Sequence, residues 1–116
     1  MKSLGKALRE HEPEVLEAMH LDMRKPTFEA YMSELGLVHA EIRNTLKHLK
    51  EWMRPERVPT PLALQVAESF IHRAPLGVVL IIGPWNYPVQ LILAPLIGAI
   101  AAGNCALVKP SNEAPQ

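Results

Sequence analysis

The sequence predicts an α/β protein, with helices first, a β arm in the middle and a β-α-β unit of a parallel sheet at the end. Charge supports this division, because residues 1–57 hold 20 of the 24 charged side chains while residues 74–108 contain neither a charged residue nor a histidine. Proline shows the opposite bias, with nine of eleven prolines at or beyond Pro55. Hydrophobic residues follow helix spacing in the first half and form continuous β-branched runs in the second.

Composition excludes several classes of protein. The 116 residues carry 12 basic and 12 acidic side chains, so the chain lacks the basic excess that a nucleic-acid-binding surface needs. A hydrophobic content of 48% is too high for a disordered chain. The single cysteine excludes an internal disulfide, and the start of the sequence lacks the apolar core of a secretory signal, so we expect a cytoplasmic protein. The histidines and the cysteine show no zinc-ligand spacing, so no metal site is expected.

Two short helices are predicted at the start of the chain. Apolar residues recur at helix spacing in Lys2–His11, and Val15, Leu16 and Met19 form a second stripe. Pro13 suits the first position of the second helix, where its missing N–H costs nothing, and Pro26 repeats this arrangement further on.

A long helix follows, with one apolar seam along its length. The seam is formed by residues spaced three or four apart, namely Leu35, Val38, Ile42, Leu46, Leu49 and Met53. Six charged residues are expected outside it, namely Glu34, Glu41, Arg43, Lys47, Lys50 and Glu51. Such a seam needs a partner. A coiled coil or regulatory helix is one interpretation, and a packing face against a following domain is the favoured one.

A connector and an arm separate the two halves. Three prolines in Arg54–Pro61 forbid a helix or a central strand there. Leu62–Ala74 mixes β-branched and aromatic residues with polar ones, which is compatible with a short strand or a hairpin arm.

The uncharged segment predicts strand, turn, helix and strand. Val78–Ile82 and Cys105–Val108 are continuous apolar runs, typical of strands buried on both faces. The run between them, Val89–Ala102, is apolar on nearly every side and predicts a helix, with Pro88 as the first helical residue, Gly103 just past the end and a kink expected at Pro95. This order predicts a right-handed β-α-β unit. A membrane hairpin is disfavoured, because no run free of glycine and proline approaches the ~20 residues that a bilayer requires.

Polar residues follow both predicted strands. Ligands bind beyond the carboxyl ends of the strands in open α/β sheets, where the first strand delivers Trp85 and Asn86 and the second delivers Lys109 and Ser111. No GxGxxG turn follows the first strand, so the common dinucleotide fingerprint is missing. By spacing alone, Asn86 could merely satisfy backbone groups in a turn, and Lys109 could be a solvated charge.

The motifs of this segment nevertheless resemble a known family. Residues 75–104 read PLGVVLIIGPWNYPVQLILAPLIGAIAAGN and continue into CALVKPS. The PWNYP and KPS motifs in this order resemble the aldehyde dehydrogenase superfamily, most closely its class 3-like branch. The upstream DMRKP, the long helix and the arm are similar as well, so the resemblance covers essentially the whole chain.

The resemblance implies an oxidoreductase, a homodimer when full-length, that converts aldehydes to carboxylic acids with NAD or NADP. In the family a cysteine thiolate attacks the carbonyl, hydride passes to nicotinamide, and a glutamate activates the water that hydrolyses the thioester. Asn86 would donate its side-chain N–H to the oxyanion, and Lys109 would bind the adenosine ribose hydroxyls or a 2′-phosphate. Further implied contacts are to the cofactor from Ile82, Gly83, Pro84, Trp85 and Ser111, and to the aldehyde from Tyr87 and Leu91.

The resemblance also implies how the chain is organised. Residues 1–54 would be the helical start of the NAD-binding domain, 55–75 a connector and arm of the oligomerisation type, and 76–116 the first β-α-β unit of a Rossmann-like sheet.

The chain also departs from the family pattern. The family's nucleophilic cysteine, general-base glutamate and glycine-rich GSTxxG turn lie downstream of KPS, so we expect an N-terminal fragment that is inactive alone. Cys105 is expected to be a core residue and not the nucleophile. Asn112 stands where the family commonly has the glutamate that holds the ribose. The alternative is a truncated product that acts only as a structural or interaction module.

Overall fold

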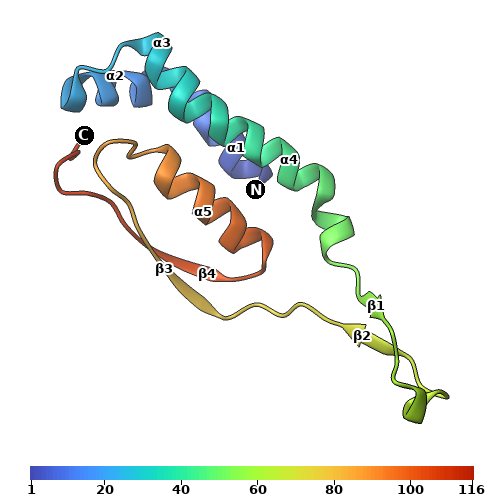
Figure 1. Ribbon diagram of the computed structural model, residues 1–116. Helices are drawn as coiled ribbons and strands as arrows, with labels where there is room; N and C mark the ends of the chain where they lie inside the picture. Colours follow the sequence, from blue (N-terminus) through green and yellow to red (C-terminus); the bar gives the residue numbers. More distant parts are fainter.

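The computed structural model describes all 116 residues as a layered body with a projecting arm (Figure 1). A two-stranded parallel sheet lies under one helix, and the N-terminal helices lie over that same helix on its other side. The α/β class predicted from the sequence is confirmed. The helices and strands, in chain order, are α1 Lys2–Glu10, α2 Glu12–Met23, α3 Thr27–Ala30, a π-helical turn Tyr31–Leu35, α4 Gly36–Trp52, β1 Glu56–Val58, a 3₁₀ turn Leu62–Leu64, β2 Ser69–Ile71, β3 Val78–Ile82, α5 Gln90–Ala101 and β4 Cys105–Lys109. None of the helices is both long enough and apolar enough to cross a bilayer.

The N-terminal helices begin close to the prolines that predicted them. Pro13 is the second residue of α2, and Pro26 is the N-cap of α3. From Thr27 to Trp52 the backbone stays helical, with one wider turn at Tyr31–Leu35, where the N–H of Gly36 bonds to the carbonyl of Tyr31. The predicted long helix is therefore confirmed, with a π-helical turn that the spacing did not show.

Two details of the predicted seam are wrong. Glu34 was placed outside it but is completely buried, because it lies four residues before Val38 on the face that α4 turns inward. Leu46 and Met53 were placed inside it but are exposed, and Thr45 is buried instead of Leu46. Thr45 shares its surroundings with Gly98 and Ala101 of α5, so the inward face of α4 meets small side chains at this point.

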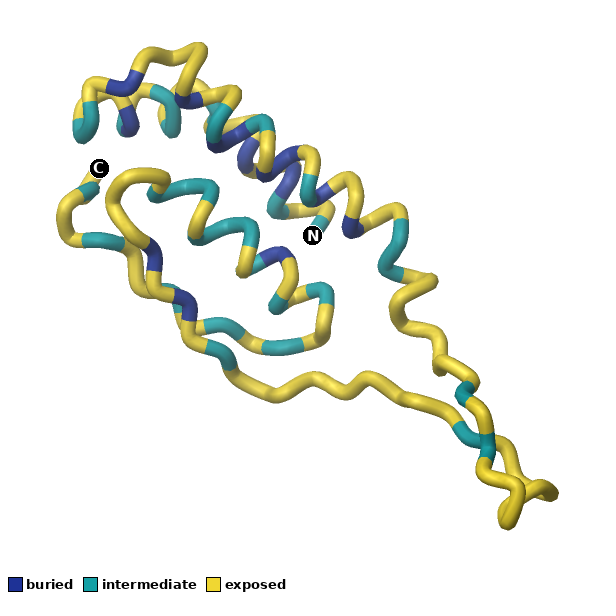
Figure 2. Tube along the Cα trace, in the orientation of Figure 1, coloured by how far each residue is buried: buried dark blue, intermediate teal, exposed yellow.

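The core joins α5 to the N-terminal helices. Ile97 of α5 is completely buried and belongs to one apolar cluster with Leu8, Met19, Ala30, Leu35, Val38 and Ile42. Figure 2 shows this concentration of buried residues where α4 passes over α1. The helical seam therefore packs against the following β-α-β unit, as the favoured interpretation predicted.

The arm is a small antiparallel hairpin. Strand β1 pairs with β2, with Arg57 opposite Phe70. β1 lies inside the proline-rich connector, where a strand is tolerated because both strands of a two-stranded ribbon are edges. Nearly every residue of the arm is exposed, and the arm extends away from the body (Figure 2), so that the whole chain measures 64 Å along its longest axis.

The β-α-β unit follows the prediction closely. Strands β3 and β4 are parallel, with Val78 beside Cys105 and Ile82 beside Lys109. Helix α5 ends in a Schellman motif: Gly103 has a φ of 81°, its N–H bonds to the carbonyl of Ile100, and the N–H of Asn104 bonds to the carbonyl of Ala99. At the other end the prediction was wrong, because Pro88 lies two residues before the first helical residue, Gln90. The helix continues through Pro95.

Only one face of this sheet is covered. Alternate residues of β3 and β4 face α5, and the others form an exposed surface that we call the outer face, comprising Val78, Leu80, Ile82, Cys105, Leu107 and Lys109. The prediction that both strands are buried on both faces is therefore wrong for this chain. The same holds for Cys105, which was expected in the core and is exposed. Leu80 and Leu107 are 59% and 64% exposed because no segment of the chain packs against them.

Candidate functional site

The candidate site lies at the carboxyl edge of the sheet. Because β3 and β4 are parallel and Ile82 pairs with Lys109, both strands end at the same edge, as the sequence predicted. The ladder continues for one more bond, from the N–H of Gly83 to the carbonyl of Lys109 at 3.0 Å. Lys109 and the turn that follows β3 are thereby fixed in register with one another.

Gly83 makes the turn into α5 possible. A Cβ at this residue would lie only 2.2 Å from Cγ1 of Ile92, in the first turn of α5. The strand and the helix approach so closely that any side chain at this residue would overlap the side chain of Ile92. This close approach fixes the short turn of Pro84–Val89, which carries the PWNYP motif.

The residues of this turn are largely exposed. The side chains of Trp85 and Asn86 face solvent, and the Asn86 carboxamide makes no hydrogen bond to the chain, although its main-chain carbonyl does. Tyr87 has one ring face against the ammonium of Lys25, at 4.3 Å from the ring centroid. Leu91, in the first turn of α5, is also partly exposed. Asn86 therefore presents a free amide donor beyond the end of β3.

Lys109 and Ser111 lie at the end of the other strand. The Lys109 ammonium donates to the carbonyl of Pro110 at 3.1 Å, which leaves two of its three donors free. The Ser111 hydroxyl accepts from the N–H of Glu113 at 3.1 Å and keeps its own proton free to donate. Ile82 places an apolar side chain on the outer face beside Lys109. This set of donors next to an apolar surface fits a nucleotide with hydroxyl or phosphate groups.

Sequence reasoning assigned no role to two charged residues behind the turn. Lys25 and Glu34 are buried together, with 2.5 Å between Nζ and Oε1, and both bond to the backbone of residues 86–90. One signal for such an acceptor is present in the sequence. The first turn of α5 has neither a capping side chain nor an acidic residue, so its free N–H groups need an acceptor from elsewhere.

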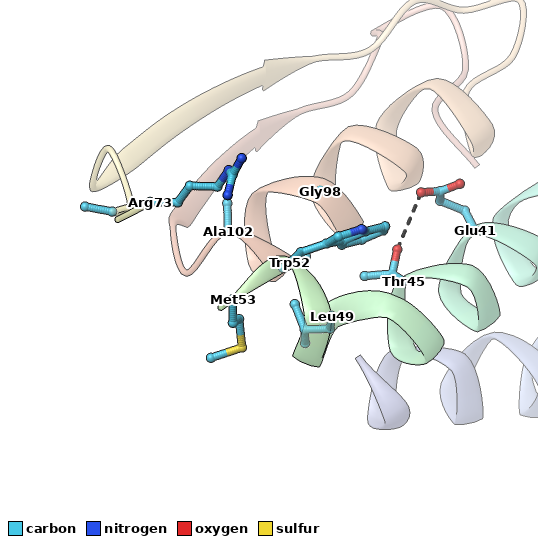
Figure 3. Close-up of a pocket in the computed structure, with 10 residues that line it drawn as sticks. Glu41, Thr45, Leu49, Trp52, Met53, Arg73, Gly98 and Ala102 are labelled. Carbon is cyan, nitrogen blue, oxygen red and sulfur yellow. Dashed lines mark hydrogen bonds between the residues drawn. The ribbon is translucent and has the colours of Figure 1, made fainter. Parts of the chain in front are cut away.

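A separate cavity lies at the opposite end of α5. It has a volume of about 270 Å³ and opens between α4, α5 and Arg73, with Trp52 and Thr45 among its lining residues (Figure 3). Asn86 precedes the first turn of α5, whereas Ala101 and Ala102 of this cavity lie at its last turn. A helix of 12 residues is about 18 Å long, so the cavity is not part of the candidate site.

The whole chain matches one protein family. The profile of the aldehyde dehydrogenase family covers residues 1–116. The chain belongs to this family.

Relatives of known name agree with this assignment. The 4,4'-diaponeurosporen-aldehyde dehydrogenase of Staphylococcus aureus (strain NCTC 8325 / PS 47) is 47% identical over 99% of this chain and 25% of that protein. Aldehyde dehydrogenase family 3 member B1 of Homo sapiens is 45% identical over 97% of this chain and 24% of that protein. The chain thus spans about a quarter of the length of these relatives and corresponds to the N-terminal part of an aldehyde dehydrogenase.

Two solved structures share the fold of this chain. The substrate-bound state of Staphylococcus aureus AldH matches 98% of this chain and 25% of that one, with a TM-score of 0.96 and 47% identity. The glyceraldehyde-3-phosphate dehydrogenase GapN from Methanocaldococcus jannaschii DSM 2661, solved in complex with NADP, matches 96% of this chain and 23% of that one, with a TM-score of 0.77 and 30% identity. The fold of the chain is therefore that of the N-terminal part of an aldehyde dehydrogenase.

Proposed function

We propose that this chain is the N-terminal part of an NAD(P)-dependent enzyme that oxidises an aldehyde to a carboxylic acid through a cysteine thioester. Family membership over all 116 residues supports the class of reaction. The observation that carries the proposal is the placement of Asn86, whose carboxamide is exposed and unbonded in a tight turn beyond the carboxyl end of β3.

Asn86 serves as the oxyanion donor in this proposal. When a thiolate adds to an aldehyde, negative charge develops on the carbonyl oxygen, and a preorganised N–H donor stabilises that charge. An amide suits this role because it donates a hydrogen bond without giving up its proton to the thiolate. The thiolate comes from the remainder of the enzyme, since the only cysteine of this chain, Cys105, lies at the start of β4, at the opposite end of the strand from Lys109.

The cofactor site combines Lys109, Ser111 and the backbone of Gly83–Trp85. When bound, the nicotinamide cofactor supplies the hydride acceptor. The free donors of Lys109 suit ribose hydroxyls or a phosphate, and the exposed Ile82 gives an apolar surface beside them. Tyr87, from the turn before α5, and Leu91, from the first turn of α5, are proposed to contact the tail of the aldehyde. The enzyme is proposed to act as a homodimer, to which the exposed apolar residues of the arm contribute.

Two variants of the full-length enzyme test these roles. Asn86→Ala is expected to lower kcat by about 10²–10³-fold, the cost of one lost oxyanion donor, and to leave the KM for the cofactor nearly unchanged. Lys109→Ala is expected to raise the KM for the cofactor with a smaller change in kcat. Aldehyde oxidation is followed by the absorbance of the reduced nicotinamide, with NAD and NADP assayed in parallel. If the two variants exchanged these kinetic signatures, the assigned roles would be wrong.

A further inference from the structure

Two buried charges lie directly behind the turn that carries Asn86. Glu34 has no exposed surface and Lys25 is 9% exposed, and their side chains form an ion pair. Burying two charges is costly unless their hydrogen-bonding groups are all satisfied. The groups that bond to this pair therefore indicate which part of the structure the buried charges stabilise.

Lys25 holds the main chain of Asn86. Its ammonium donates to Glu34 Oε1 and to the main-chain carbonyl of Asn86 at 3.0 Å, across a separation of 61 residues. The same nitrogen lies over the ring of Tyr87, the next residue of the turn. One cation thus contacts two consecutive residues of the turn.

Glu34 holds the other end of the turn. Its second oxygen, Oε2, accepts from the N–H of Val89 at 2.9 Å and from the N–H of Gln90 at 3.2 Å. These N–H groups begin α5, which has no cap of its own, so the carboxylate takes the place of the missing capping residue. The pair thus holds the backbone of the turn by hydrogen bonds at residues 86 and 89–90, while the Asn86 carboxamide makes no hydrogen bond to the chain.

We propose that Lys25 and Glu34 are positioning residues, which fix the backbone of Asn86 so that its carboxamide points at the developing oxyanion. This inference rests on the proposed function. Both oxygens of Glu34 already have partners and neither residue is more than 9% exposed, so a direct role in proton transfer does not fit their geometry. A displacement of about 1 Å in a catalytic group can cost roughly 10²-fold in rate. Hydrogen bonds that hold this turn in one position should therefore raise kcat.

The test removes both charges together in the full-length enzyme. Truncating one partner alone would leave an unpaired buried charge, whereas Lys25→Met with Glu34→Gln removes the pair and keeps an oxygen acceptor for Val89 and Gln90. We expect kcat to fall about 10–100-fold, with the KM for the cofactor changed by less than about twofold. The matched control makes the same two changes at the exposed pair Lys6–Glu10 of α1, as Lys6→Met with Glu10→Gln, and should leave kcat unchanged.

The decisive measurement adds Asn86→Ala to this double variant. If the pair acts through Asn86, the amide is already misplaced, and Asn86→Ala should cost much less than its factor in the wild-type background. If the two effects simply multiply, the positioning role is overturned while the role of Asn86 stands. Absence of aldehyde oxidation by the wild-type enzyme would overturn the proposed function and this inference together.

A milder variant tests the proposal if the double variant does not fold. Glu34→Asp keeps the charge but withdraws the carboxylate by one methylene from the N–H groups of Val89 and Gln90. We expect a smaller loss of kcat in the same direction, with faster amide hydrogen exchange in the peptide that spans residues 83–93. An unchanged kcat together with unchanged exchange in this peptide would overturn the proposal.

Discussion

Gly83→Ala is expected to destabilise the junction between β3 and α5 by about 1–3 kcal/mol. The added Cβ would lie 2.2 Å from Cγ1 and 2.5 Å from Cδ1 of Ile92, whereas ordinary contact begins at 3.4 Å. About 1.2 Å of movement (3.4 − 2.2) is therefore required. Rotation of the Ile92 side chain relieves part of this overlap, and the rest has to displace the first turn of α5.

Hydrogen exchange in the full-length enzyme measures this cost locally. Every 1.4 kcal/mol is tenfold in an equilibrium constant, so exchange in peptides spanning β3 and the start of α5 should accelerate by about 5- to 150-fold. Gly98→Ala is the matched control, because a Cβ there meets nothing within 4 Å. Alanine is favoured over glycine inside a helix by about 0.8–1.0 kcal/mol, so this variant should slow exchange in α5.

A double variant decides whether the overlap is the cause. Ile92→Ala removes Cγ1 and Cδ1, the two atoms that the new Cβ would overlap, and keeps Cβ at an ordinary 3.7 Å, so Gly83→Ala should cost little in that background. An equal cost in the presence and absence of the Ile92 side chain would refute this account of Gly83.

Four further expectations concern the exposed outer face and the isolated chain. Iodoacetamide should label Cys105 rapidly in the 116-residue chain kept dilute enough to remain monomeric, where the thiol is exposed, and slowly in the full-length enzyme, where we expect further chain to cover this face. Cys105→Ala should retain most of the enzyme's activity, and peptide mapping that found fast labelling in step with inactivation would contradict this. The isolated chain should self-associate through the outer face, because a two-stranded sheet cannot cover its own apolar residues; a monodisperse monomer in light scattering would count against that. It should also show no cofactor-dependent aldehyde oxidation, since an oxyanion donor without nucleophile and base has little to stabilise, and measurable turnover would refute the fragment interpretation.

Local patterns in the sequence predicted most of the fold. The strands β3 and β4, their parallel pairing and the glycine that ends α5 all follow from short-range rules, because apolar runs, prolines and glycines restrict the backbone directly. The start of α5 was misplaced by two residues. The acceptor that caps the first turn of α5 is the carboxylate of Glu34. A rule based on neighbours along the chain cannot identify a residue that is so far away in the sequence.

The limits of the prediction lie where burial depends on a partner. Leu46 was placed in the seam because it is apolar, yet the structure buries Thr45, since steps of three and four residues both fit a helix. Glu34 was placed outside because it is charged, although its spacing to Val38 is that of the buried face. The sequence predicted that Asn86 and Lys109 lie at the carboxyl edge of the sheet, as the structure has them, but could not show which charges hold the turn in place.

The separation of 55 positions between Glu34 and Val89 also has a consequence for synthesis. A ribosome adds about 5–20 residues per second. Glu34, whose carboxylate caps α5, is therefore synthesised roughly 3–11 seconds before the first turn of that helix. The uncharged β-α-β unit, which has no cap of its own, is therefore made only after its acceptor is available. A circular permutant that placed residues 1–53 last would reverse this order. Its apolar strands and uncapped helix would stay exposed to solvent until the N-terminal helices had been synthesised.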